Sequence, residues 1–150
     1  MQSIEEVLSI NAGRALPIFL NGDTRKCLAL FQSVLGKEPH VIAHCHTEFE
    51  TSDLYREVLK NSTCSVPPMD AVLDVQDVTD PLDAAGYKWV VLAGLQRLPG
   101  ETQKDLAFDV KVAFETAKLK FVIIGSFAKG NPLIVYNGDL CARIAEIKVL

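Results

Sequence analysis

The chain has 150 residues, of which 49% are hydrophobic and 23% are charged, a composition typical of one globular domain with a single core. Its net charge of −4 leaves no excess of Lys and Arg to neutralise phosphates, which argues against binding to nucleic acid. No apolar run approaches the roughly 20 residues that span a bilayer. The N-terminal MQSIEEVLSI is acidic and does not resemble a signal peptide, so we expect a cytoplasmic protein without a membrane partner.

Apolar residues at helical spacing alternate with short, uniformly apolar runs along the chain. The predicted helices cover residues 4–10, the stretch from a cap at Asp23 or Thr24 to Gly36, residues 51–59 and residues 101–118, with a helical turn at 81–85. The predicted strands cover residues 17–20, 41–45, 89–92, 121–124 and 144–149. Residues 62–80, which contain two adjacent prolines and many acids, are expected to be the least ordered part.

Strands that are apolar throughout and separated by helices predict a parallel sheet buried on both faces. The fold class is therefore α/β, a three-layer sandwich with a mainly parallel five-stranded sheet in a single domain over residues 1–150. Ligands of such sheets bind beyond the carboxyl ends of the strands. Those ends lie here at Gly22, His44–His46, Gly94 and Ser126.

The stretch NGDTRKCL, residues 21–28, lies where a phosphate-binding loop would connect the first strand to a helix. The loop signature G-x-x-x-x-G-K-[ST] is not present, because Gly22 and Lys26 are too close and a second glycine is missing. Asp23 adds a negative charge where phosphate would lie. Cys27 replaces the hydroxyl that holds Mg²⁺, so the loop is expected to have lost its function.

Several segments together resemble the core of P-loop ATPases of the bacterial AAA+/STAND kind. They are NPLIVYNGDLCARIAEIKV at residues 131–149, TSDLYREVL at 51–59 and VVLAGLQRLPGETQKDLAFDVK at 90–111. The resemblance implies a P-loop NTPase-like fold, which would end before the helical lid of that group. It places Ala93 and Gly94 where the Walker B strand needs carboxylates for metal and water. We therefore expect a degenerate site without catalytic residues, bound metal or cofactor, with Gly22, Arg25 and Lys26 as a vestigial nucleotide contact.

Two other groups of residues offer weaker candidates for chemistry. His44 and His46 point the same way in a strand and could bind a metal, but no third ligand lies near in sequence. Cys45 could act as a nucleophile, although it points to the opposite face of the strand. The four cysteines lie far apart and contain no C-x-x-C pair, so they are expected to be free and mostly buried thiols.

Two features of the C-terminal segment are expected to have structural roles. Residues 137–139, Asn-Gly-Asp, have the composition of a tight turn. Arg143 resembles a family arginine that contacts nucleotide or a neighbouring subunit, but a salt bridge to Asp139 or Glu146 is expected instead.

The function expected from the sequence is that of a pseudoenzyme, a non-catalytic NTPase-like domain that acts through protein–protein interaction. It would form a homodimer or bind another protein, with Phe127 or Tyr136 as the aromatic anchor of the interface. The alternative is a small-molecule or nucleotide binder, or an enzyme, that uses the crevice at the strand ends. That alternative would rely on His44, Cys45 and His46, or on nucleotide bound at residues 22–26 without Mg²⁺.

Overall fold

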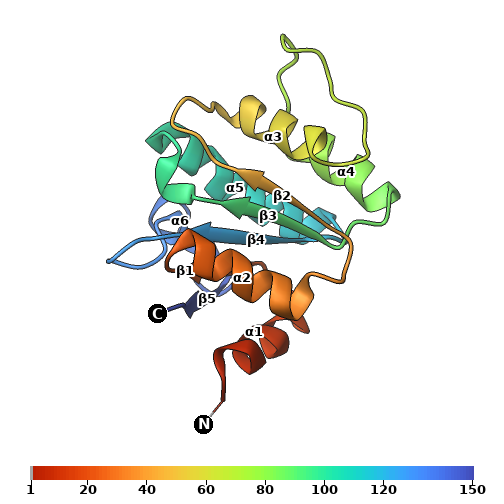
Figure 1. Cartoon of the computed structure of the whole chain (residues 1–150). Coiled ribbons are helices and arrows are strands. Elements are labelled where there is room, and N and C mark those ends of the chain that lie inside the picture. The colour runs from red at the N-terminus through yellow and green to blue at the C-terminus, as the bar shows by residue number, and fades with distance from the viewer. Residues whose placement is uncertain (1) are drawn as a thin grey trace.

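The computed structural model describes residues 2–150, which form one five-stranded sheet with helices on both faces (Figure 1). All neighbouring strands are parallel, and their order is β2-β3-β4-β1-β5. The strands are β1 (Ile18–Asn21), β2 (His40–His44), β3 (Trp89–Ala93), β4 (Lys120–Gly125) and β5 (Ala145–Lys148). Each begins within one residue of its predicted start, which confirms the predicted α/β sheet.

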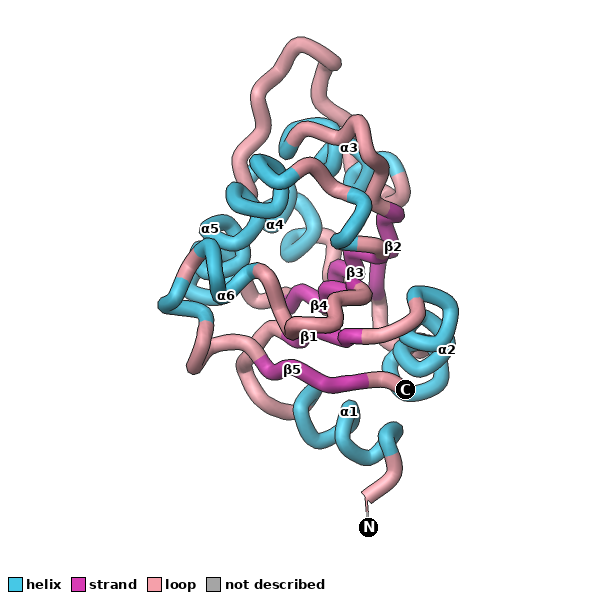
Figure 2. Tube along the Cα trace, turned by 90° about the vertical axis from the view of Figure 1, so that its left-hand side faces the viewer, coloured by secondary structure: helices cyan, strands magenta, loops and turns pink. Residues whose placement is uncertain are grey.

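The helices divide between the two faces of the sheet and make the predicted three-layer sandwich (Figure 2). On one face lie α1 (Ile4–Ala12) and α2 (Thr24–Leu35), and on the other lie α3 (Thr51–Lys60), α4 (Gln76–Ala84), α5 (Gly100–Thr116) and α6 (Leu133–Tyr136). Short 3₁₀ turns span Leu95–Arg97 and Gly138–Leu140. Within residues 2–150, no helix combines the length and the apolar character needed to cross a membrane.

Alternate residues of the central strand β3 pack into two separate cores, as the pleat of a strand requires. Val90 and Leu92 contact the layer of α3, α4 and α5. Trp89 and Val91 contact the layer of α1 and α2. Every residue of β3 is buried, which explains why the sequence shows an uninterrupted apolar run there and no alternation.

The prediction of low order over residues 62–80 is wrong for its C-terminal part, where α4 begins at Gln76. Asp74 and Asp77 stabilise that start reciprocally, because each carboxylate accepts the backbone N–H of the other residue at 2.9–3.0 Å. Val78 is fully buried against the core. The remaining stretch, residues 61–75, forms the long loop that projects beyond α3 and α4 in Figure 1.

Candidate functional site

The suspected phosphate loop lies at the junction of β1 and α2. There the side chain of Asp23 accepts the backbone N–H groups at the start of α2. Asp23 is the N-cap of α2, and its Oδ1 accepts the backbone N–H groups of Arg25 at 3.0 Å and Lys26 at 3.2 Å. A phosphate at a helix N-terminus would be bound by the same kind of amide group. The carboxylate therefore uses the donors that a phosphate would need, and its charge repels an anion.

The link between β1 and α2 is also too short to wrap around a phosphate. Only Gly22 and Asp23 lie between the last residue of β1 and the first residue of α2. The N–H of Gly22 donates to the carbonyl of Gly125 at 2.9 Å, so Gly22 extends the pairing of the sheet. A Cβ at Gly22 would lie 2.3 Å from the carbonyl oxygen of Val149. This glycine is thus required by the close approach of the chain after β5.

The three residues that follow Asp23 differ in where they lie. Arg25 and Lys26 are exposed in the first turn of α2. Cys27 is fully buried, and its Sγ lies 4.0 Å from the carbonyl oxygen of Leu20. Burial, and secondly the charge of Asp23, raise the pKa of Cys27 to about 11. Cys27, which the loop signature places at the position of a Mg²⁺-binding hydroxyl, therefore faces the core as a neutral thiol.

A contact that the sequence did not predict joins the carboxyl end of β1 to the segment that follows β4. The Asn21 amide donates to the carbonyl of Phe127 at 2.9 Å, and its Oδ1 accepts the N–H of Phe127 at 3.0 Å. The ring of Phe127 lies 6.2 Å from that of Phe19 and against Gly125. Phe127 therefore packs onto the core, and of the two predicted anchors Tyr136 is the exposed one.

The end of β3, where the resemblance places the Walker B carboxylates, has Ala93 and Gly94. Ala93 is buried, and Gly94 adopts the left-handed conformation with φ 93° and ψ 45°. Its N–H donates to the carbonyl of Ile124 at 2.9 Å. Gly94 is therefore suited to a backbone turn, because side-chain-bearing residues rarely adopt this conformation.

The candidates at the end of β2 do not converge on one site. His44 and His46 are exposed, and the ring of His46 packs edge-on against Phe49 at 4.8 Å. Cys45 is buried, which raises its pKa to about 12 despite the opposing effect of Arg97. A protonated thiol is a poor nucleophile at neutral pH. Across residues 2–150, no group of three or more His, Cys, Asp or Glu side chains is placed to hold a metal ion.

The prediction for Arg143 was wrong about its partner. Its guanidinium pairs with Glu115 of α5 at 3.1 Å, whereas Asp139 pairs with Lys111 of the same helix at 2.9 Å. The hydrogen bond and charge of Lys111 lower the pKa of Asp139. The carboxylate of Glu146 accepts the N–H of residue 131 at 3.1 Å. The segment before β5 is thus tied to α5.

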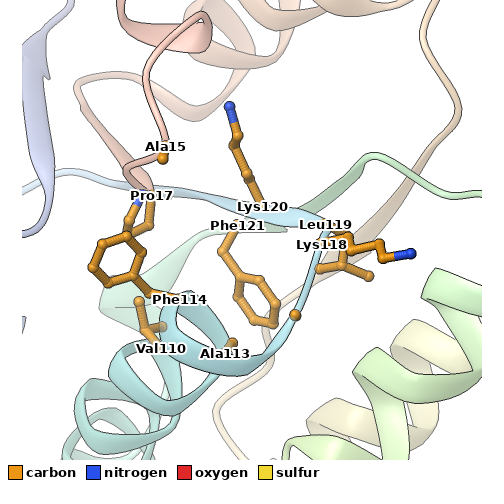
Figure 3. Close-up of a pocket in the computed structure, with 10 residues that line it drawn as sticks. Ala15, Pro17, Val110, Ala113, Phe114, Lys118, Leu119, Lys120 and Phe121 are labelled. Atoms are coloured by element: carbon orange, nitrogen blue, oxygen red, sulfur yellow. The ribbon is translucent and has the colours of Figure 1, made fainter.

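An apolar cavity of about 120 Å³ lies near the amino ends of the strands, where β4 begins (Figure 3). Phe114 and Phe121 line it together with Pro17. Figure 3 shows the Lys120 side chain pointing away from Phe121, and its Nζ donates to the carbonyls of residues 12 and 14. The cavity is therefore remote from the carboxyl ends of the strands.

No known protein family and no curated protein matches this sequence. Solved structures do match its fold. The Walker-type ATPase of Pyrococcus abyssi is 15% identical with a TM-score of 0.63, over 97% of this chain and 51% of that one. A Drosophila ORC complex with AT-rich DNA and Cdc6 is 12% identical with a TM-score of 0.60, over 97% of this chain and 55% of that one. Cdc6p from Pyrobaculum aerophilum is 14% identical with a TM-score of 0.58, over 95% of this chain and 43% of that one.

The chain spans about half the length of these structures, one of which is named as a Walker-type ATPase. At such low identity the likeness concerns the fold alone. The protein therefore has a P-loop NTPase-like α/β fold, built on a five-stranded parallel sheet with helices on both faces.

Proposed function

We propose that this chain is a non-catalytic NTPase-like domain that acts by binding a protein, either a second copy or another partner. The observation that supports the proposal is the Asp23 carboxylate, which accepts the two amide groups at the start of α2. Hydrolysis of a nucleotide also needs a carboxylate at the end of β3 to hold the metal. Ala93 and Gly94 supply none.

A protein suits this domain better than DNA as a partner. One of the similar structures is a complex with AT-rich DNA, but that describes the Drosophila proteins. Here the net charge is −4, and Lys and Arg number 15 against 19 Asp and Glu. Binding to the DNA backbone depends on an excess of cations, which this chain lacks.

The competing function is residual nucleotide binding through Gly22, Arg25 and Lys26 without Mg²⁺. The similarity to ATPases favours it, and thermal unfolding with ATP distinguishes the two. A site with a Kd of about 100 µM would stabilise the fold by about 2 kcal/mol at about 5 mM ATP, which is a rise in Tm of at least about 4 °C. We expect no such rise with or without Mg²⁺.

Two variants make the nucleotide test specific. Asp23→Asn removes the charge but keeps an oxygen that can cap α2, and Lys26→Ala removes the amine. A rise in Tm with ATP in the native protein that disappears in Lys26→Ala would refute the proposed function. A rise that appears in Asp23→Asn alone would identify Asp23 as the group that excludes nucleotide and would support it.

A further inference from the structure

A groove rich in carboxylates lies between α5, the start of α3 and the end of the long loop before α4, with a volume of about 700 Å³. We call it the acidic groove. Its carboxylates are Glu50, Asp74, Glu101, Asp105 and Asp109. Among residues 2–150, no Lys or Arg side chain lines it. It lies on the face of the sheet that is covered by α3, α4 and α5, and it uses none of the residues at the β1–α2 junction.

Two apolar side chains stand in the acidic groove and are open to solvent. Val72 is 90% exposed and Phe108 is 49% exposed. The backbone next to Val72 is held in place, because the N–H of Leu73 donates to Ser52 Oγ at 2.9 Å. The buried guanidinium of Arg56 also donates to the carbonyls of residues 68 and 71. The exposure of Val72 is therefore built into a fixed loop.

The charges in the acidic groove repel one another without a compensating cation. Burial raises the pKa of the Asp109 carboxyl, and the negative charges of Asp105 and Asp74 raise it further, against the lowering effect of the Tyr55 hydrogen bond. Thr51 donates to Asp105 at 2.8 Å. Hydroxyl groups thus supply hydrogen bonds but no positive charge, and a cation placed here would relieve the repulsion.

The geometry points to a partner of one kind, and we propose that the acidic groove docks a basic amphipathic helix of another protein. The apolar face of such a helix would cover Val72 and Phe108, and its flanking Lys or Arg would pair with Asp74, Asp105 and Asp109. A metal ion fits less well, because no group of three ligands is placed for one within residues 2–150. Nucleic acid would be repelled.

This inference deepens the proposed function by naming a surface and the chemistry of its partner. It rests on the proposed function only in assuming that the domain works through protein contacts. Failure of the docking inference does not imply failure of the proposed function. Nucleotide binding tests the β1–α2 junction, whereas peptide binding tests the acidic groove.

The test uses a synthetic helical peptide of about 18 residues, with Leu at helical spacing on one face and Lys on both flanks. Titration calorimetry with the native chain is expected to show one saturable site with a Kd below about 100 µM at low salt. A peptide of the same composition in scrambled order is the first control. It retains the charge but has no apolar face, and we expect at least tenfold weaker binding.

Matched variants locate the site. Asp105→Asn with Asp109→Asn removes two charges from the groove while keeping an acceptor for Tyr55, and should weaken peptide binding about tenfold. Phe108→Ser should also weaken it. Glu48→Gln with Asp80→Asn makes the same change in net charge on exposed residues outside the groove, and should leave the Kd within about twofold.

Several outcomes would overturn the inference. Equal binding of the scrambled peptide, or equal weakening by both pairs of neutralising variants, would show general attraction to an acidic protein. Saturable binding of Ca²⁺ that Asp105→Asn with Asp109→Asn abolishes would make the groove a metal site. A dimer that the same two substitutions dissociate would make a second copy its occupant.

Discussion

Replacing Asp23 by Ala tests the central observation, that its carboxylate caps α2 and occupies the anion position. Its Oδ1 accepts two N–H groups at 3.0 and 3.2 Å. Loss of an N-cap acceptor costs about 0.5–2 kcal/mol, and loss of a negative charge at a helix N-terminus adds about 0.3–1 kcal/mol at an exposed site. We expect the free energy of unfolding to fall by about 1–3 kcal/mol, and the Tm by about 2–12 °C.

Asp23→Asn separates the hydrogen bond from the charge. Asparagine is as good an N-cap as aspartate, so this variant should lose only the interaction of the charge with the helix, about 0.3–1 kcal/mol. Urea unfolding followed by circular dichroism measures both variants. The loss in Asp23→Asn should shrink with added NaCl because the carboxylate is exposed, whereas most of the loss in Asp23→Ala should persist.

A second readout concerns the anion position itself. In Asp23→Ala the N–H groups of Arg25 and Lys26 lose their acceptor, so sulfate should recover part of the lost stability by binding there. The native chain should gain only the general stabilisation by sulfate that Asp23→Asn also shows. If Asp23→Ala loses less than about 0.3 kcal/mol, or if sulfate acts equally on all three proteins, the reasoning about Asp23 is refuted.

Three further substitutions test other parts of the account by urea unfolding. Gly22→Ala should destabilise the fold by more than about 1 kcal/mol, because its Cβ would lie 2.3 Å from the Val149 carbonyl oxygen; equal stability would show that β5 moves freely. Gly94→Ala should cost about 1 kcal/mol or more, because φ is 93°. The folded pKa of Cys45, about 12, lies above the ordinary value of 9.0, so the folded state keeps its proton and stability falls as pH rises above 9. That fall should reach up to about 1.4 kcal/mol per pH unit and be smaller in Cys45→Val, and an unchanged slope would contradict it.

The sheet could be predicted from the sequence because each strand is buried by helices and carries its apolar signal locally. Residues 89–93 and 120–125 are examples, with runs of Val, Leu and Ile that periodicity detects. Only the C-terminal part of α4 was predicted, as a helical turn at 81–85, because proline is typical of a helix start, whereas the structure places Pro81 inside the helix. The pair of aspartates that caps this helix also resembles a polar loop.

The residues at the expected phosphate-loop and Walker B positions, Asp23, Ala93 and Gly94, are read directly from the sequence, and the loss of phosphate chemistry there stays a prediction. The tertiary contacts that require particular residues near the β1–α2 junction could not be predicted. Gly22 lies against Val149, and Asn21 bonds to the backbone of Phe127, in contacts between segments that lie far apart in the sequence. The acidic groove combines residues near 50, 74 and 105, each of which looks like an ordinary solvated charge in its own segment.

Self-association through the surface after β4 remains a prediction, and the structure shows which residues can test it. Phe127→Asp would disturb the core, because its ring packs on Phe19. Val135 and Tyr136 of α6 are 83% and 38% exposed, so Val135→Asp and Tyr136→Asp should alter the surface and leave the Tm nearly unchanged.

Light scattering over a wide range of concentrations measures the mass of the native chain and of these variants. If the partner is a second copy bound at this surface, the mass should rise from one chain towards two, and Val135→Asp should return it to one. Val72→Asp is the matched control, because Val72 is as exposed as Val135 but lies in the acidic groove. A mass of one chain for the native protein at every concentration would refute self-association, and the domain would then have to act on a different protein. A dimer that Val72→Asp dissociates and Val135→Asp does not would move the contact from α6 to the groove.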